Sequence, residues 1–218
     1  MSLTAADRPE ASRVATRTIP PEAPSGRYDE CWIAAVSVAD AVLRRIYGVY
    51  GFCDHQDCLL RVARAAARHR LTLSDGTEVH PGEPIAMLHF WNERIPRFPP
   101  GGPDLGWARL FRKRMLFSLR ALAQFMNSHP EWDDVHAIRG CVNFGSRARR
   151  WQIQVAAARF GFELVPVESA YGLHECGEDL LIWAFARAFN PFSLRRHVMW
   201  RDRTEIWISK PSLLRRYG

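Results

Sequence analysis

Three polar side chains that can bind a ligand or transfer a proton lie within or just after one apolar segment, IAMLHF, in the sequence. They are His89, Asn92 and Glu93, and they come just before a Pro/Gly-rich turn. Open α/β sheets bind their ligands beyond the carboxyl ends of their strands, so this is a candidate site. We predict that His89 acts as a general base oriented by Glu93, and that Asn92 contacts a polar ligand.

A purely structural interpretation competes with this one. A histidine in an apolar strand is often a core residue whose ring is satisfied by a backbone carbonyl. Glu93 has Arg94 and Arg97 close by in the sequence and can form an ion pair with either. Both interpretations stay open at this point, because the position of a residue at a strand end is only an analogy between folds.

A second group of polar residues, Asn143 to Arg147, follows the next predicted strand. Ser146 is placed to cap the helix that is predicted to begin there. Backbone amides at a helix N-terminus attract anions, and Gly145 permits close approach. We therefore predict that Asn143, Ser146 and Arg147 bind an anionic ligand. The glycine and lysine pattern of a P-loop is missing, and a plain strand-to-helix turn is the alternative.

Thiol and imidazole groups occur in two clusters. Cys53, His55 and Cys58 lie together, and His174 and Cys176 follow much later. These are zinc ligands by type, but their spacing matches no standard zinc pattern, and isolated cysteines are often small buried apolar residues. We predict no metal and no cofactor. No Ser-His-Asp or Cys-His-Asn order in the sequence points to nucleophilic catalysis.

The elements that must position these side chains alternate along most of the chain. After a flexible arm at 1–28 we predict one domain over 29–218, with a hairpin that turns at Ser74, Asp75 and Gly76. The predicted helices are 29–47, 55–70, 104–127, 147–160 and 178–189, and the predicted strands are 85–91, 135–142, 162–167 and 204–208.

This alternation predicts an α/β fold, a single domain with a mixed or mostly parallel sheet of about four to six strands, flanking helices and an N-terminal helical segment. The amphipathic helix 104–127 joins the strands 85–91 and 135–142. If these two strands are parallel neighbours, His89 and the turn at 143–147 open onto one crevice.

Composition restricts the class of partner. The 218 residues carry a formal net charge of +7, but the basic side chains are nearly all arginines dispersed over several predicted helices, which is typical of solvated faces. Arginines also interleave with Trp200 and Trp207, without any RNA-binding signature, so nucleic acid is not the expected partner. Five cysteines and no secretory signal predict a cytoplasmic protein. No apolar run reaches the ~20 residues of a membrane span, and peripheral membrane contact stays open.

The segment LSDGTEVHPGEPIAMLHFWNERIP, followed by GPDLGWA, resembles the YkoP-like domain, a poorly characterised bacterial family. RRIYGVYGF, DCLLR and GFELV extend the resemblance over most of residues 40–168. Members occur as single small proteins and as domains joined to polysaccharide-deacetylase-like enzymes. The resemblance implies a context in envelope glycan or lipid metabolism, and it assigns no chemistry to His89 or Asn92.

These observations predict a protein that binds an anionic or polyhydroxylated ligand, such as a sugar phosphate or a lipid headgroup, between His89 and Ser146. One alternative is a transferase in which His89 removes a proton from a hydroxyl and the turn at Ser146 holds a phosphate or acyl-carrier group. Another is an interaction module whose Arg-rich helices bind an acidic protein partner.

Overall fold

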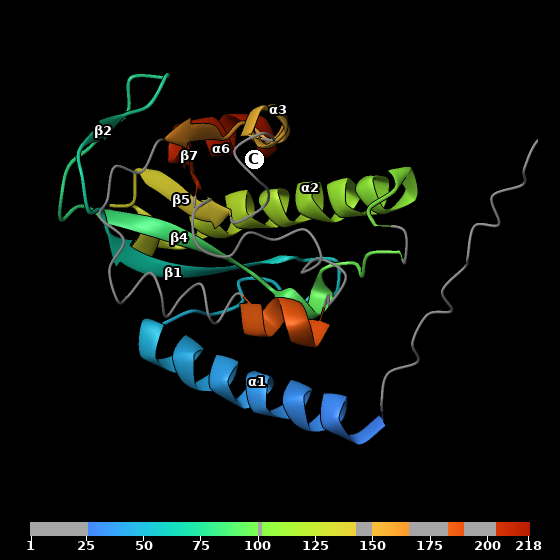
Figure 1. The fold of residues 1–218 in the computed structure, drawn as a ribbon. Helices are drawn as coiled ribbons and strands as arrows, with labels where there is room; N and C mark the ends of the chain where they lie inside the picture. Colours follow the sequence, from blue (N-terminus) through green and yellow to red (C-terminus); the bar gives the residue numbers. More distant parts are fainter. Residues whose placement is uncertain (1–25, 100–101, 143–149, 166–182, 190–203) are drawn as a thin grey trace, which may run out of the picture.

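The computed structural model describes residues 26–99, 102–142, 150–165, 183–189 and 204–218. Within these ranges the fold centres on one five-stranded sheet (Figure 1). Its strands, in the spatial order β1-β4-β5-β7-β6, are Leu60–Ala66, Pro84–Phe90, Ala137–Val142, Thr204–Ser209 and Glu163–Val165. The β4 and β5 strands are parallel, and the other neighbours are antiparallel. The α/β class and the mixed sheet predicted from the sequence are confirmed.

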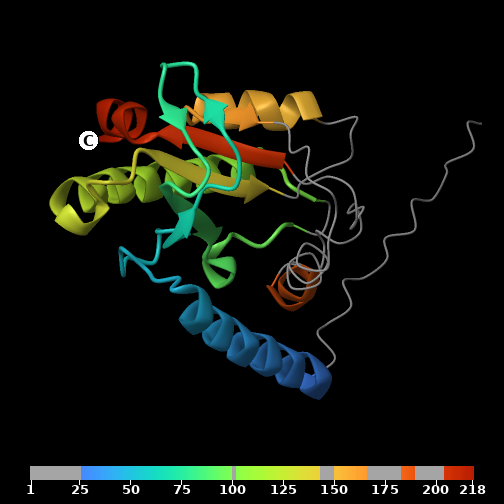
Figure 2. The same cartoon turned by 90° about the vertical axis from the view of Figure 1, so that its left-hand side faces the viewer.

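The long helices lie on both sides of this sheet. α2 (Leu105–Ser128), α3 (Arg150–Arg159) and α6 (Lys210–Tyr217) cover one face, as Figures 1 and 2 show. α1 (Gly26–Tyr47) lies away from α2, near the β1 edge, with the helical residues 183–189 beside it. Two 3-10 turns, η1 (Asn92–Arg94) and η2 (Pro130–Trp132), follow β4 and α2.

The segment predicted as a helix at 55–70 is a strand instead, and that prediction was wrong. Its alanines and arginines have high helix propensity, which is a weak prior that tertiary context overrides. Here the seven residues of β1 pair with β4, from Leu60 opposite Phe90 to Ala66 opposite Pro84. Val62 and Ala63, which face opposite sides of the strand, are both buried. Burial on two faces makes the strand the stable form of this segment.

The hairpin prediction is confirmed. β2 (Leu71–Thr72) and β3 (Glu78–Val79) pair antiparallel around a turn in which Gly76 adopts a φ of 85°. A left-handed backbone of this kind favours glycine. Asp75 fixes the turn, because its Oδ1 accepts a hydrogen bond of 3.1 Å from the Thr77 amide. Its Oδ2 accepts hydrogen bonds from the hydroxyls of Ser209 and Ser212, which tie the hairpin to α6.

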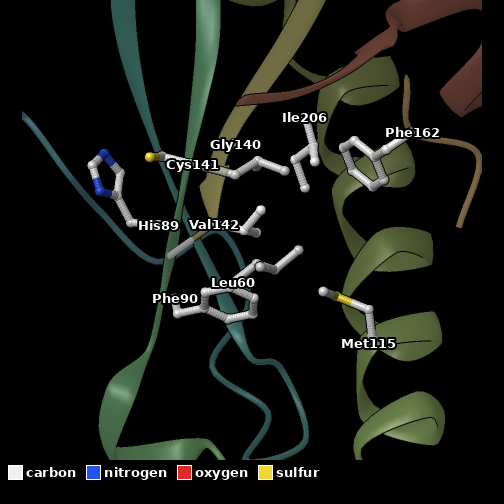
Figure 3. Close-up of a pocket in the computed structure, with 10 residues that line it drawn as sticks. Leu60, His89, Phe90, Met115, Gly140, Cys141, Val142, Phe162 and Ile206 are labelled. Carbon is white, nitrogen blue, oxygen red and sulfur yellow. The ribbon is translucent and has the colours of Figure 1, made fainter. Parts of the chain in front are cut away.

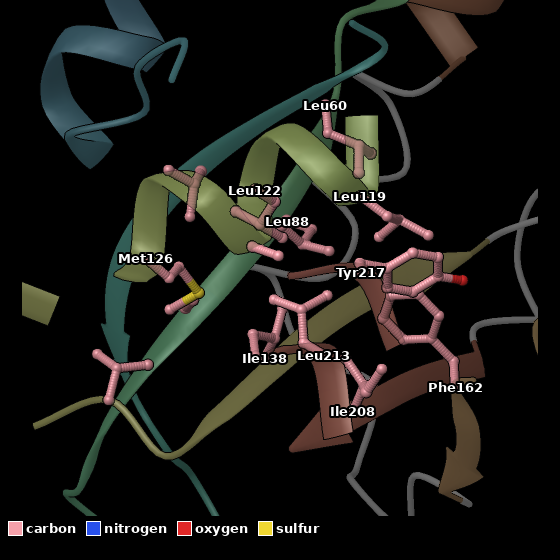
Figure 4. Close-up of a cluster of buried hydrophobic side chains, with 14 of the residues drawn as sticks. Leu60, Leu88, Leu119, Leu122, Met126, Ile138, Phe162, Ile208, Leu213 and Tyr217 are labelled. Carbon is pink, nitrogen blue, oxygen red and sulfur yellow. The ribbon is translucent and has the colours of Figure 1, made fainter. Parts of the chain in front are cut away.

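The apolar core lies between the sheet and α2 with α6 (Figure 4). α2 begins after Asp104, whose Oδ1 accepts a hydrogen bond of 2.7 Å from the Trp107 amide, and it is amphipathic as predicted. The side chains that it buries here are apolar except for one serine: Met115, Ser118, Leu119, Leu122, Ala123 and Met126.

The other predicted elements fall close to their expected positions. β4, β5, β6 and β7 begin and end within a few residues of the predicted bounds, and α2 is displaced by one residue. α1 begins three residues earlier than predicted, at Gly26. The predicted helices at 147–160 and 178–189 are helical in their described parts, 150–159 and 183–189. The predicted arm lies almost wholly outside the described residues.

Candidate functional site at the carboxyl edge of β4 and β5

The face of the sheet that points away from α2 carries polar groups on four neighbouring strands. Arg61 of β1 pairs with His89 of β4, and Cys141 of β5 pairs with Glu205 of β7. Leu88 pairs with Gly140 in the parallel register, so the next two residues, His89 and Cys141, stand beside each other. We call Arg61, His89, Cys141 and Glu205 the polar row.

Figure 3 shows the middle of the polar row directly. The side chains of His89 and Cys141 point to the side of the sheet opposite Met115 of α2. Both are half-buried. A thiol and an imidazole beside each other can donate and accept hydrogen bonds and exchange a proton with a bound molecule. His89 is therefore not a residue of the apolar core beneath α2.

The first end of the row, Arg61, is buried and held by two carboxylates. Its Nη1 donates to Asp40 Oδ2 at 2.9 Å, and its Nη2 lies 3.5 Å from Glu93 Oε2. Burial lowers the pKa of the Arg61 guanidinium, and the neighbouring charges of Glu93 and Asp40 oppose that change. Glu93 is thus fixed by Arg61 of the neighbouring strand, where the sequence had suggested Arg94 or Arg97 as its ion-pair partner.

Trp91 joins this end of the row to the loop at 53–58. The guanidinium carbons of Arg61 and Arg94 lie 4.2 and 3.2 Å from the Trp91 ring centroid. Arg94 Nη1 also donates to the His55 carbonyl at 2.8 Å, so it fixes the loop. Gly51 permits the ring to approach, because a Cβ there would stand 2.9 Å from Trp91 Cζ3. Trp91 therefore fixes the start of η1, which contains Asn92 and Glu93.

The other end of the row, Glu205, is also buried and fully engaged. Its carboxylate forms an ion pair with Arg139 and accepts a hydrogen bond of 3.0 Å from Trp207 Nε1. His69 Nε2 lies 3.8 Å from the same carboxylate. Ion pairs thus neutralise the charges at both ends of the polar row. His89 and Cys141 form its half-buried centre.

The predicted site residues divide between the two strand ends. His89 lies on β4, and Asn92 and Glu93 lie in η1 directly after it. Because β4 and β5 are adjacent and parallel, the geometric condition set by the sequence is met. Asn143, Ser146 and Arg147 follow the end of β5 and lie outside the described residues, as does the predicted helix cap.

Sequence reasoning missed Arg61 and Cys141. Side chains alternate between the two faces of a strand, so an arginine between the buried Leu60 and Val62 indicates a charged group on the opposite face. This inference holds only if the segment is a strand. The helix prediction for 55–70 concealed it. Nothing in the sequence points to Cys141, because only the register of the sheet places it beside His89.

A small pocket at this edge has a mostly apolar lining that includes Leu60, Phe90, Met115, Phe162 and Ile206. His89 and Cys141 also contribute to the lining, and the volume is about 20 Å³. That is room for about one water molecule, well below the several hundred Å³ of a typical ligand pocket. The polar face, and not this pocket, is therefore the candidate binding surface.

The thiols and imidazole near residue 55 show no metal-binding arrangement. Cys58 is fully buried, and His55 Nδ1 accepts a hydrogen bond of 3.1 Å from the Asp57 amide. In the part of the chain that the structure describes, no group of three His, Cys, Asp or Glu side chains could hold a metal ion. His174 and Cys176 lie outside that part.

Many arginines are bound within the fold. Arg64 pairs with Asp134 at 2.6 Å and Arg114 with Asp57 at 2.9 Å, while Arg139 pairs with Glu205. Trp207, which the sequence placed in an Arg/Trp surface, is buried in the second apolar cluster. Arg195, Arg196, Arg201, Arg203 and Trp200 lie outside the described residues. None of the described helices is long and apolar enough to cross a membrane.

Comparison with known proteins gives one result. No curated protein and no solved structure matches the chain. The model of the YkoP domain matches residues 29–217, which extends the resemblance seen in the sequence to nearly the whole chain, and the protein therefore belongs to the YkoP domain family.

Proposed function

We propose that the protein binds a small anionic and polyhydroxylated ligand, of the sugar phosphate or lipid headgroup type, at the carboxyl edge of β4 and β5. The observation that carries the proposal is the parallel adjacency of these two strands. Both strands end at the same edge of the sheet, and ligands of α/β folds bind at such edges.

The hydroxyl groups of the ligand would contact His89 and Glu93. The Glu93 side chain is 34% exposed and its Oε2 lies 3.5 Å from Arg61, so it is oriented and still reachable from solvent. A carboxylate has several acceptor positions, and a half-buried imidazole supplies a donor or an acceptor. Asn92, next to Glu93 in η1, adds a side-chain amide that can both donate and accept hydrogen bonds.

The anionic group of the ligand is assigned to Asn143, Ser146 and Arg147. Two arginines near the edge of the sheet are engaged elsewhere: Arg61 by two carboxylates, and Arg94 by the His55 carbonyl. An anion therefore needs other donors, and the sequence after β5 offers a serine, a glycine and an arginine before α3.

Thermal-shift measurements with glycerol 3-phosphate, glucose 1-phosphate, inorganic phosphate and glucose test this function. A ligand that binds the native state raises the Tm, so we expect a shift with a phosphorylated polyol and a smaller shift in His89→Ala. His80→Ala, at a 44%-exposed side chain beside the hairpin, is the matched control. Sedimentation with phosphatidylglycerol vesicles distinguishes a lipid headgroup from a soluble ligand. If no probe shifts the Tm, or His89→Ala responds like the wild type, the proposal is wrong.

A further inference from the structure

The three helices that cover one face of the sheet carry no acidic residue. α2, α3 and α6 each contain basic residues, but neither aspartate nor glutamate occurs in any of them. They lie on the same side of the sheet, as Figures 1 and 2 show. We call six of their exposed basic side chains the basic face: Arg109, Arg112, Lys113, Arg120, Arg159 and Arg216.

Four members of the basic face lie on α2, within about 100° of one another around its axis: Arg109, Arg112, Lys113 and Arg120. Arg109 precedes Arg112 by three residues and Lys113 by four. Like charges at these spacings destabilise a helix, whereas a helix face that only meets solvent usually mixes the two signs. Arg114 of the same helix pairs with Asp57 at 2.9 Å, but none of the four forms an ion pair with another described residue. The uniform sign of this face therefore indicates an anionic partner.

Contacts around Tyr217 connect the cations of the three helices. Arg216 Nη2 of α6 donates a hydrogen bond of 2.6 Å to the carbonyl of Arg159, the last residue of α3. Its guanidinium carbon lies 5.8 Å from the ring centroid of Tyr217. Burial raises the pKa of Tyr217, and the neighbouring charges of Arg216, Arg120 and Arg112 oppose that change. The basic face thus continues from α2 across α6 to α3.

Apolar side chains are exposed among these charges. Leu105 of α2 is 77% exposed, and Trp151 and Val155 of α3 are 62% and 43% exposed. Trp151, Val155 and Arg159 follow one another at intervals of four and lie within about 80° around the axis of α3. Ala157, on the other side of that helix, is buried in the apolar core. Helices that lie on a membrane surface combine tryptophan and aliphatic side chains with arginine and lysine in this way.

We propose that the basic face binds the surface of an anionic phospholipid membrane. Its cations contact the lipid phosphates, and Leu105, Trp151 and Val155 insert between the headgroups. A nucleic acid would also offer phosphates, but it would leave the leucine and valine side chains without an apolar environment. His89 points to the side of the sheet opposite α2, so the proposal does not depend on the ligand site described above.

Co-sedimentation with vesicles tests the charge. We expect salt-sensitive binding to vesicles that contain phosphatidylglycerol, and much weaker binding to vesicles of phosphatidylcholine alone. Arg109→Glu combined with Arg120→Glu should weaken binding by about tenfold or more. Arg45→Glu combined with Arg70→Glu is the matched control, because it changes the net charge equally at two exposed arginines outside the basic face. Circular dichroism verifies that each variant is folded. Equal binding of the two double variants, or no binding of the wild type to anionic vesicles, overturns the proposal.

A second comparison tests the apolar contact. Leu105→Ser combined with Trp151→Ser should weaken vesicle binding, because these side chains leave water on the membrane. Ile46→Ser on α1, at a side chain that is 68% exposed, should not weaken it. His89→Ala should still bind the vesicles, so this proposal and the proposed ligand site can fail separately. Unchanged binding of the Leu105 and Trp151 double variant would overturn the insertion. Binding to a single-stranded DNA oligonucleotide, without binding to vesicles, would overturn the membrane as the partner.

Discussion

The guanidinium of the buried Arg61 donates a hydrogen bond of 2.9 Å to Asp40, and this ion pair joins the edge strand β1 to helix α1. The same guanidinium lies over Trp91 and reaches Glu93. One side chain therefore connects α1 to the strand end that carries the predicted ligand-binding residues. The attachment of α1 and the geometry of the candidate site depend on the same contact.

Asp40→Ala should destabilise the fold strongly. It leaves Arg61, whose side chain is 3% exposed, with the more distant Glu93 as its remaining carboxylate partner. Removing one partner of a buried ion pair costs about 3 kcal/mol of unfolding free energy. Urea denaturation measures the loss, with Asp54→Ala, an exposed aspartate of the nearby loop, as control. Equal effects of the two changes would contradict the structural role of Asp40.

Ser118→Ala tests how the loop before β1 is held. The buried Ser118 hydroxyl accepts a hydrogen bond of 2.7 Å from the Leu59 amide and donates one to the Arg114 carbonyl. Alanine leaves the Leu59 amide buried without this acceptor, at a cost of about 1–3 kcal/mol. Ser128→Ala on the same helix is the control, because Ser128 is exposed and donates only to Gln124. Thermal unfolding should show a lower Tm for the first variant alone.

Asp75 predicts a pH dependence of stability. Burial opposes the charged form, but hydrogen bonds from Ser209, Ser212 and Thr77 prevail and hold the pKa of Asp75 well below its usual range. Since the folded-state pKa is depressed, this contribution is present above the unfolded pKa of about 4 and is lost as the pH falls below it.

Asp75→Asn should therefore lower the unfolding free energy at neutral pH by about 1 kcal/mol, a modest figure because Asp75 is solvent-exposed. Its stability should also fall less steeply than that of the wild type between about pH 4 and pH 2. Denaturation curves at several pH values measure both. Parallel pH profiles for the two proteins would show that the carboxylate is not held as described.

Gly140→Ala tests the close packing beneath the polar row. A Cβ at this position would stand 3.0 Å from Ile206 Cγ1, so the change should cost about 1–3 kcal/mol by overpacking. Ile206→Ala removes that atom. In the Ile206→Ala background the same glycine substitution should cost much less, and a double-mutant cycle measures the difference. An equal cost in both backgrounds would place the strain elsewhere.

The sequence by itself predicted the helix at 104–127, observed as Leu105–Ser128, the hairpin around Gly76 and the strand that carries His89. Each depends on a local rule: the spacing of apolar residues along one helix face, a turn that needs a positive φ, and an apolar segment bounded by turn residues. It also placed the family, because the residues that carry the resemblance are continuous in the chain.

Only the tertiary structure decided that residues 60–66 form a strand and that Arg61, His89, Cys141 and Glu205 share one face. Their segments are far apart in the sequence, and strand pairing sets their register through hydrogen bonds between segments. Intrinsic propensity alone favoured a helix at 55–70, because alanine and arginine stabilise a helix without contacts to another segment. Pairing with β4 and burial on both faces outweigh that preference, and neither is visible until the strands meet.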